Sequence, residues 1–313
     1  MLRLIARRVV LMVPTALVVS ALLFFGVTQL LGSPASMMLG QDASPQAIAA
    51  LNAQYGFDRP AVTQYLHWLG GALTGDLGRS YATQVPVATA IAAAIPVTAE
   101  LTLWAIALAT VAAIFFGTLP AAPRVVRPLV TVASLIGITV PNFMLGISLI
   151  FVLSVQTNLL PSTGWVPWSA GIGTHLAHMV MPVLTLSAYY FGAFSIVYRA
   201  EYQGVIQRMF IRVARARGLS EWRVTFRHAA PNAVLPVITF IGIAMGQLTG
   251  GAVVTETIFS MPGTGRLFVA SIEAHDFPMM LAIGMLIVVG VVLMNLLADI
   301  AYAIVNPQIR HAA

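Results

Sequence analysis

Long apolar runs restrict the fold of this chain more than any other feature of its sequence. Several of them exceed the 18 or so residues that indicate a membrane-spanning helix. Of the 313 residues, 59% are hydrophobic and only 8% are charged, whereas a soluble globular domain carries roughly 25% charged residues. The sequence therefore predicts an all-α integral membrane protein with no separate soluble domain.

The positions of the apolar runs predict six transmembrane helices, near 9–31, 97–119, 129–155, 177–198, 232–257 and 279–304. The first run follows arginines, as a signal peptide does. It is too long for a cleavable apolar region and has no small-residue cleavage site, so we interpret it as a helix. Four parts result: a cytoplasmic end with the first helix at 1–31, an extracytoplasmic loop with short helices at 32–96, a five-helix core at 97–304, and a cytoplasmic tail at 305–313.

The distribution of arginine predicts the orientation. Between the predicted spans, only Arg59, Arg79 and Arg266 fall on one side, and the other arginines fall on the opposite side. Because basic residues concentrate in cytoplasmic loops, the arginine-rich side is expected to be cytoplasmic, with both termini there. The net charge of +6 is then explained by topology, and a nucleic-acid partner is not expected.

Two absent residue types exclude kinds of site. The sequence contains no lysine, so it cannot form a Walker A phosphate loop, which needs a Lys to reach the nucleotide phosphates. It also contains no cysteine, which excludes a disulfide framework and a thiolate metal site.

The outer segment, 32–96, carries helix signals of its own. Ser44 followed by Pro45 predicts a helix start, and Ile48, Leu51 and Tyr55 follow with helical spacing. A second amphipathic piece, "QYLHWLGGAL", is expected to end at its two glycines, Gly70 and Gly71. A structured loop of this length favours contact with an outer partner, although a cap that only seals the bundle is the alternative.

Residues 204–230, here called the elbow, gather arginines in a segment too polar to span a membrane. Gly218 divides it into two short helical pieces, since glycine supplies the positive φ at which a helix ends, and Ser220 is expected to cap the second piece. A helix-turn-helix protruding into the cytoplasm is predicted. The alternative is a segment that binds anionic lipid headgroups.

The spacing of the elbow resembles the cytoplasmic signature of ABC importer permeases: a small pair at Val213 and Ala214, then Gly218, then Pro231. Arg212 stands where that family usually has Glu, but "RVARARGLS" is similar to the form of its peptide branch. The resemblance extends through "LRLIARRVVLMVP", "YGFDRPAVTQYLHWLGGALTGDLGRS", "LLPSTG", "RHAAPNAVLPVIT", "GGAVVTETIFSMPGTGRL" and "NLLADIAYAIVNPQIR". The chain thus resembles the first permease of the dipeptide, oligopeptide and nickel importers.

This resemblance implies a translocation subunit that is not an enzyme and binds no cofactor. It implies a second permease, two partner subunits that bind ATP and Mg, an outer solute-binding protein, a peptide substrate, and a bacterial or archaeal cytoplasmic membrane. Nickel chelates or other small solutes remain alternatives. The residues that it assigns to contact with an ATP-binding subunit are Arg212, Ala214, Arg215, Ala216, Arg217, Gly218, Leu219, Ser220, Glu221 and Trp222.

A few polar and small residues within the predicted spans are candidates for the pathway or for helix packing. Glu256 and Asp299 are acids near span ends, with either a functional or a packing role open. Glycines four apart predict close approach of another helix, within the chain or across the pore. The pathway or packing set is Gly242, Gly246, Gln247, Thr249, Gly250, Thr255 and Glu256.

The remaining motifs give weaker evidence about function. His175 and His178 form an HxxH pair that could ligate a metal from one helix face, but no third ligand is evident. The run "PGTGRL" at 262–267 is expected to be a loop. An intramembrane protease is disfavoured because there is no HExxH, no GxSxG and no pair of mid-span acids. A secondary transporter is disfavoured because six unequal spans with one elbow show no repeated halves.

Overall fold

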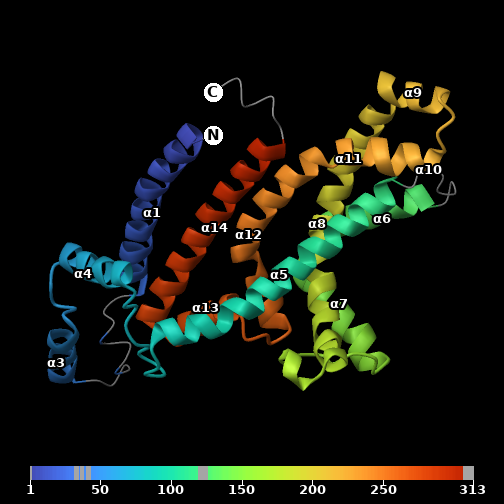
Figure 1. Ribbon diagram of the computed structural model, residues 1–313. Helices are drawn as coiled ribbons and strands as arrows, with labels where there is room; N and C mark the ends of the chain where they lie inside the picture. The colour runs from blue at the N-terminus through green and yellow to red at the C-terminus, as the bar shows by residue number, and fades with distance from the viewer. Residues whose placement is uncertain (1, 32–34, 36–38, 40–43, 119–125, 306–313) are drawn as a thin grey trace.

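The computed structural model describes residues 2–31, 35, 39, 44–118 and 126–305. This part of the chain is built from helices, and its extended pairing is limited to an isolated bridge between Arg79 and Pro86. Figure 1 shows the helices as a splayed bundle with short helices at both ends. The all-α prediction is confirmed.

The two ends of the bundle carry different elements. Helix α1 (Leu2–Leu31) begins, and α14 (Phe277–Val305) ends, at the end of the molecule where the elbow lies, at the top of Figure 1. At the opposite end lie α3 (Pro45–Tyr55), α4 (Ala61–Thr74) and α13 (Thr264–Glu273). Within the described part of the chain, the arginine-rich elbow and the short helices α3, α4 and α13 are therefore separated by the length of the bundle.

Among the residues that the structure describes, three helices are long and apolar enough to cross a membrane: α5 (Val87–Thr118), α8 (Ile172–Ile206) and the Phe277–Leu297 part of α14. Two bent helix pairs raise the number to five if each pair is one span. Helix α1 contributes a shorter apolar stretch, Val13–Thr28. The count of six spans therefore stays a prediction. Helix α5 begins at Val87, ten residues before the predicted span and inside the predicted outer loop.

The prediction of one continuous helix over 129–155 is wrong. The chain forms α6 (Val126–Thr139), then α7 (Asn142–Leu149) continuing into the π-helix η1 (Ile150–Gln156), and the two parts meet at an angle of 111°. Pro141 lies at the break. Its ring disfavours helical geometry in the residue before it and removes a backbone donor, so the helix stops and starts again in a new direction.

The region around the fifth predicted span also differs from expectation. Helix α11 (Ala230–Ala233) leads into α12 (Leu235–Ile258), and the helical segments on the two sides of Val234 are bent by 47°. The run "PGTGRL" is not all loop, because α13 begins at Thr264 within it.

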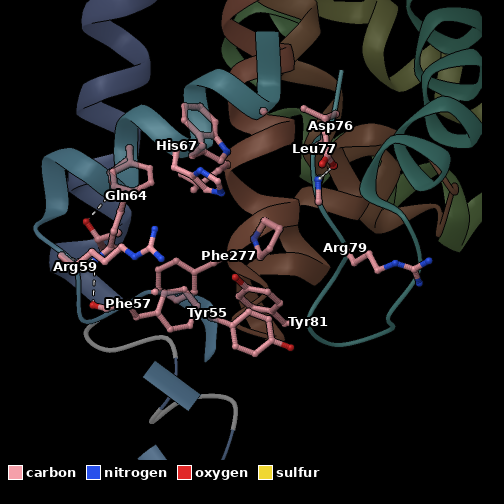
Figure 2. A pocket seen from close by; sticks show the side chains of 18 of the residues that line it. Tyr55, Phe57, Arg59, Gln64, His67, Asp76, Leu77, Arg79, Tyr81 and Phe277 are labelled. Carbon is pink, nitrogen blue, oxygen red and sulfur yellow. Dashed lines mark hydrogen bonds between the residues drawn. The ribbon is translucent and has the colours of Figure 1, made fainter. Parts of the chain in front are cut away.

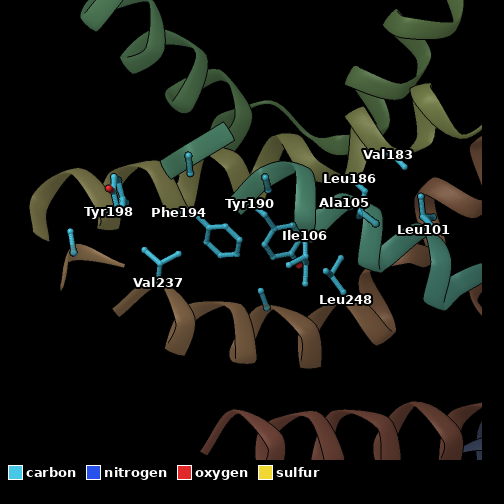
Figure 3. Close-up of a cluster of buried hydrophobic side chains, with 14 of the residues drawn as sticks. Leu101, Ala105, Ile106, Val183, Leu186, Tyr190, Phe194, Tyr198, Val237 and Leu248 are labelled. Carbon is cyan, nitrogen blue, oxygen red and sulfur yellow. The ribbon is translucent and has the colours of Figure 1, made fainter. Parts of the chain in front are cut away.

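The main apolar core lies between α5, α8 and α12. Fully buried side chains such as Leu101, Phe194, Tyr198 and Leu248 fill it, as Figure 3 shows. Helix α6 crosses α8 at close range, because a Cβ on Gly137 would overlap the carbonyl of Ala188. A Cβ on Gly192 would likewise overlap the carbonyl of Ser134, so both crossings depend on glycine.

Candidate functional site

The elbow is a helical hairpin at the end of α8. Helix α9 (Met209–Ala216) follows α8 after two residues, and the chain then turns through Gly218 into α10 (Glu221–Arg223). Helix α10 continues into the π-helix η3 (Val224–Ala229) and α11, which lead back to α12. Figure 1 shows α9 and α10 at the tip of this hairpin. The predicted pair of short helical pieces divided by Gly218 is therefore present.

Gly218 is required by backbone conformation and not by crowding. Its φ is +76°, in the left-handed region, and a Cβ added to it would meet nothing within 4 Å. The Gly218 N–H donates to the carbonyl of Arg215 at 2.9 Å, and the Leu219 N–H donates to the carbonyl of Ala214 at 3.3 Å. These bonds end α9 at a position where a side chain would be strained.

One ion pair joins the two arms of the hairpin. The guanidinium of Arg215 donates to both carboxylate oxygens of Glu221, from Nε at 2.8 Å and from Nη2 at 3.1 Å. Hydrogen bonding to Glu221 raises the pKa of Arg215 above its ordinary value. Both side chains are well exposed, so water weakens the pair to about 0.2–1 kcal/mol.

The elbow has a buried face and an exposed apolar face. Ile211, Ala214 and Val224 are buried in the core together with Tyr202 of α8. On the outside, Met209 is 73% exposed and Trp222 is 72% exposed, and Phe210 and Val213 are also exposed. An apolar surface between arginines on a firmly packed hairpin is suited to contact with another protein.

The residues predicted to contact an ATP-binding subunit fall into an exposed group and a buried or half-buried group. Arg212, Arg215, Ala216, Arg217, Gly218, Ser220, Glu221 and Trp222 are exposed. Ala214 is buried and Leu219 is half-buried against the core, so these two anchor the elbow. Ser220 occupies the predicted N-cap position with extended backbone, but its side chain makes no capping hydrogen bond. Sequence analysis did not single out Met209 or Phe210, which lie within the exposed surface.

At the opposite end, α3, α4 and the start of α14 surround an open cavity of about 600 Å³ (Figure 2). Ser44 accepts a hydrogen bond from the Ala47 N–H and Pro45 begins α3, which confirms that helix start. Helix α4 does not end at Gly70 and Gly71; it continues to Thr74 and ends at Gly75 in the left-handed conformation. The expected end was wrong because Gly70 and Gly71 keep helical geometry and Gly75 supplies the turn.

Aromatic rings line the wall of this cavity, and a buried carboxylate holds one of them in place. Tyr55 stacks on Phe57 with centroids 5.6 Å apart, and Tyr81 meets both rings edge-on. Asp276, buried between α13 and α14, accepts hydrogen bonds from the Ser80 hydroxyl and, at 3.1 Å, from the Tyr81 N–H. Burial raises the pKa of the Tyr81 hydroxyl to about 12.

Glu256 is fully buried near the end of α12, and donors surround its carboxylate. Oε1 accepts from the Thr98 hydroxyl at 2.6 Å, and Oε2 accepts from the N–H groups of Gly265 and Arg266 at 2.8 and 3.0 Å. These amides belong to the first turn of α13, where a negative charge is stabilised. A Cβ on Gly263 would overlap the carboxylate. Glu256 therefore ties α5, α12 and α13 together.

His175 is also a structural residue in the described chain. Its Nδ1 lies 2.7 Å from the carbonyl oxygen of Val166 and its Nε2 lies 2.9 Å from Glu100 Oε1, while Trp168 stacks on the ring. His178 instead contacts the carbonyl of Thr174. Among the described residues, no group of three His, Asp or Glu side chains could hold a metal. Sequence analysis missed Glu100, although it is the single acid in the run 97–119.

The predicted pathway residues have different surroundings. A Cβ on Gly246 would lie 3.2 Å from Asn295 Oδ1, so the helix that approaches Gly246 is α14 of this chain. Thr255 is buried, Gly242 is half-buried and Gln247 is exposed. The side chains of Thr249 and Asp299, and the surroundings of Gly250, lie outside the described residues.

Comparisons with known proteins agree along the whole chain. Residues 109–311 match the family model described as "Binding-protein-dependent transport system inner membrane component", and residues 1–102 match the model for the N-terminal part of such membrane components. The glutathione transport system permease protein GsiC of Escherichia coli K12 is 36% identical over 313 residues, covering 99% of this chain and 100% of the relative. The same protein of Shigella boydii serotype 4 is 35% identical over the same shares.

Proposed function

The chain belongs to the family of binding-protein-dependent transport system inner membrane components and is a permease subunit of an ABC importer; we propose that, with a second permease, it forms the pathway for short peptides. Two ATP-binding subunits drive the pathway from the cytoplasm, and an outer solute-binding protein delivers the peptide. ATP and Mg bind to those partner subunits. This chain binds no cofactor and performs no covalent chemistry.

The exposed apolar face of the elbow is the observation that carries the coupling proposal. Met209, Phe210 and Trp222 are presented to solvent on a hairpin whose other face is packed into the core. A push on such a surface moves α8 and α12 with it, because close-packed interiors transmit displacement. We assign docking of an ATP-binding subunit to this face, and assign to the buried Ala214 the role of an anchor.

We infer the orientation from the same arrangement and from the arginine distribution. With the arginine-rich elbow in the cytoplasm, the start of α1 and the end of α14 lie on the cytoplasmic side. The cavity between α3, α4 and α14 then faces outward. We propose that this face receives the solute-binding protein, and that the chain crosses the membrane six times.

The substrate class rests on the relatives. Those reported above are named for glutathione transport, and glutathione is a tripeptide. We propose a short peptide, with glutathione as the first solute to test. Uptake of labelled glutathione and labelled dipeptides, compared in cells with and without the chain, measures this. Uptake that does not change for either solute contradicts the proposed substrate and leaves the coupling proposal standing.

The coupling proposal has a matched pair of variants. Gly218 and Gly204 both have open space for a Cβ, but only Gly218 has a positive φ. Gly218→Val should misdirect α10, because a β-branched residue at positive φ is strongly disfavoured. In the reconstituted complex we expect normal membrane insertion, weakened association with the ATP-binding subunits and loss of substrate-stimulated ATP hydrolysis. Gly204→Val should keep both the association with the ATP-binding subunits and the substrate-stimulated ATP hydrolysis. A Gly218→Val complex that transports as well as the parent contradicts the assignment.

A further inference from the structure

Helix α4 carries an apolar stripe that the described part of the chain leaves largely exposed, with Leu69 half-buried. Val62, Leu66, Leu69 and Leu73 recur at i, i+4, i+7 and i+11, which places them on one face of a helix. Val62 is 60% exposed, Leu66 is 59% exposed and Leu73 is 80% exposed. Four aliphatic side chains on one face of a 14-residue helix need an apolar neighbour.

A second face of α4 is held against the middle of α1. The Tyr65 hydroxyl lies 2.8 Å from Ser20 Oγ and donates to the carbonyl of Leu17 at 3.3 Å. The rings of Tyr65 and Trp68 lie 5.6 and 5.8 Å from the ring of Phe24. Ser20 and Phe24 are buried. The position of α4 along α1 is therefore defined by these contacts.

This position along α1 corresponds to a depth in the membrane. The sequence has arginines at positions 7 and 8, before the apolar stretch Val13–Thr28 of α1. Because arginine is rare in the hydrocarbon core, we place the start of α1 at the headgroup region. Because a helix rises about 1.5 Å per residue, Leu17 lies about 14 Å and Phe24 about 24 Å beyond Arg8. The hydrocarbon core is about 30 Å thick. The contacts with α4 thus extend from about the middle of the membrane, at Leu17, into the leaflet opposite to the one where α1 begins, at Phe24.

The third face of α4 is polar and borders water. Thr63, Gln64, His67 and Gly71 line the open cavity, and Figure 2 shows Gln64 and His67 on that wall. Helical spacing places these residues away from the aliphatic stripe. The helix therefore separates the aqueous cavity from whatever covers the stripe.

We propose that α4 lies in the outer leaflet as an in-plane amphipathic helix and that lipid acyl chains cover Val62, Leu66, Leu69 and Leu73. The stripe then continues the apolar surface of α1, where Val13, Val18 and Leu22 are also exposed. Lipid contact anchors the rim of the outer cavity to the membrane. This inference needs α1 to cross the membrane, as proposed above, and is independent of the transported solute.

Single cysteines test the proposal directly, because the chain has no cysteine of its own. Leu66→Cys on the stripe, Thr63→Cys on the cavity face and Val18→Cys on α1 are each labelled with a nitroxide in the complete transporter in lipid nanodiscs. All three positions are exposed, so the fold should tolerate the labels. Collision of each label with oxygen, which concentrates in lipid, is compared with collision with a water-soluble nickel chelate.

We expect the Leu66 label to behave like the Val18 label, with oxygen collisions several-fold more frequent than chelate collisions, and the Thr63 label to show the reverse. A Leu66 label as open to the chelate as the Thr63 label overturns the proposal in favour of a stripe in water. A Leu66 label shielded from both reagents also overturns it and indicates cover by protein, such as the second permease. A Val18 label open to the chelate would instead contradict the membrane position of α1.

Discussion

Charged side chains are exposed at the elbow and buried at the opposite end of the bundle, which we propose faces outward and call the outer end. At the elbow, arginines lie on the surface, and the pair between Arg215 and Glu221 is exposed to water. At the outer end, the carboxylates of Glu256 and Asp276 are buried and accept hydrogen bonds from backbone amides and hydroxyls. The charged side chains at the elbow can form ion pairs with a partner protein at little energetic cost, because they are already exposed. The buried carboxylates at the outer end instead link helices through hydrogen bonds.

This difference follows from solvation. A buried carboxylate is expensive unless every oxygen has a donor, so Glu256 can exist only where Thr98 and the first turn of α13 surround it. An exposed pair gains little, because water already stabilises both ions. We therefore expect substitutions at the outer end to affect stability first, and substitutions at the elbow to affect coupling first.

The largest effect is expected for Glu256→Ala. Removing the carboxylate leaves the buried amide of Gly265 and the partly buried amide of Arg266 without their acceptor, and a buried donor without a partner costs about 1–3 kcal/mol. The thermal midpoint of the purified protein should fall clearly. Glu273→Ala, at an exposed position of α13, the helix that carries the two amides, is the control and should leave the midpoint unchanged. Equal thermal midpoints for the two variants would contradict the claim that the buried Glu256 carboxylate stabilises the outer end of the bundle.

A smaller effect, on binding alone, is expected for Trp222→Ala. Truncating a well-exposed aromatic side chain changes the free energy of unfolding by no more than about 0.5 kcal/mol, but loss of a central interface tryptophan costs about 2 kcal/mol of binding. We expect an unchanged thermal midpoint and an ATP-binding subunit that is bound more weakly in a pull-down titration. Trp222→Phe should recover part of the affinity. Full affinity in Trp222→Ala would place the docking surface elsewhere.

The smallest effect is expected for Glu221→Arg. This change removes the ion pair between Glu221 and Arg215 and places two positive charges next to each other. Exposed pairs are worth about 0.2–1 kcal/mol, so substrate-stimulated ATP hydrolysis should decrease only mildly, and less at high salt. The charge-swapped double variant Arg215→Glu with Glu221→Arg restores the pair and should recover the activity. If the double variant is as impaired as Glu221→Arg, the pair does not stabilise the elbow.

Several structural features could be predicted because they depend on neighbours in sequence. Ser44 and Pro45 start α3, and Gly218 adopts the positive φ that ends α9. The break at Pro141 could also have been predicted, since proline restricts the residue before it. The sequence analysis missed it because the run 129–155 is apolar throughout. The end of α4 was misplaced because three nearby glycines compete, and only Gly75 takes the left-handed conformation.

Contacts between distant residues could not be predicted in the same way. Nothing near Glu100 indicates that it meets His175, and nothing near Glu256 indicates Thr98, because these pairs are joined only when α5 packs on α8 and α12. The sequence analysis also did not identify all of the glycines at which helices approach closely. Sequence analysis selected Gly242, Gly246 and Gly250, while α6 and α8 approach each other through Gly137 and Gly192.

The sequence by itself determined that this protein is helical, belongs in a membrane and turns through a glycine in a charged elbow, because hydrophobicity and backbone preference are properties of short segments. The tertiary structure alone decided which acids are buried and satisfied, which face of the elbow is exposed, and how deep α4 lies along α1. Those features depend on where separate helices meet, and burial and hydrogen bonding acquire their energy only once the helices are packed.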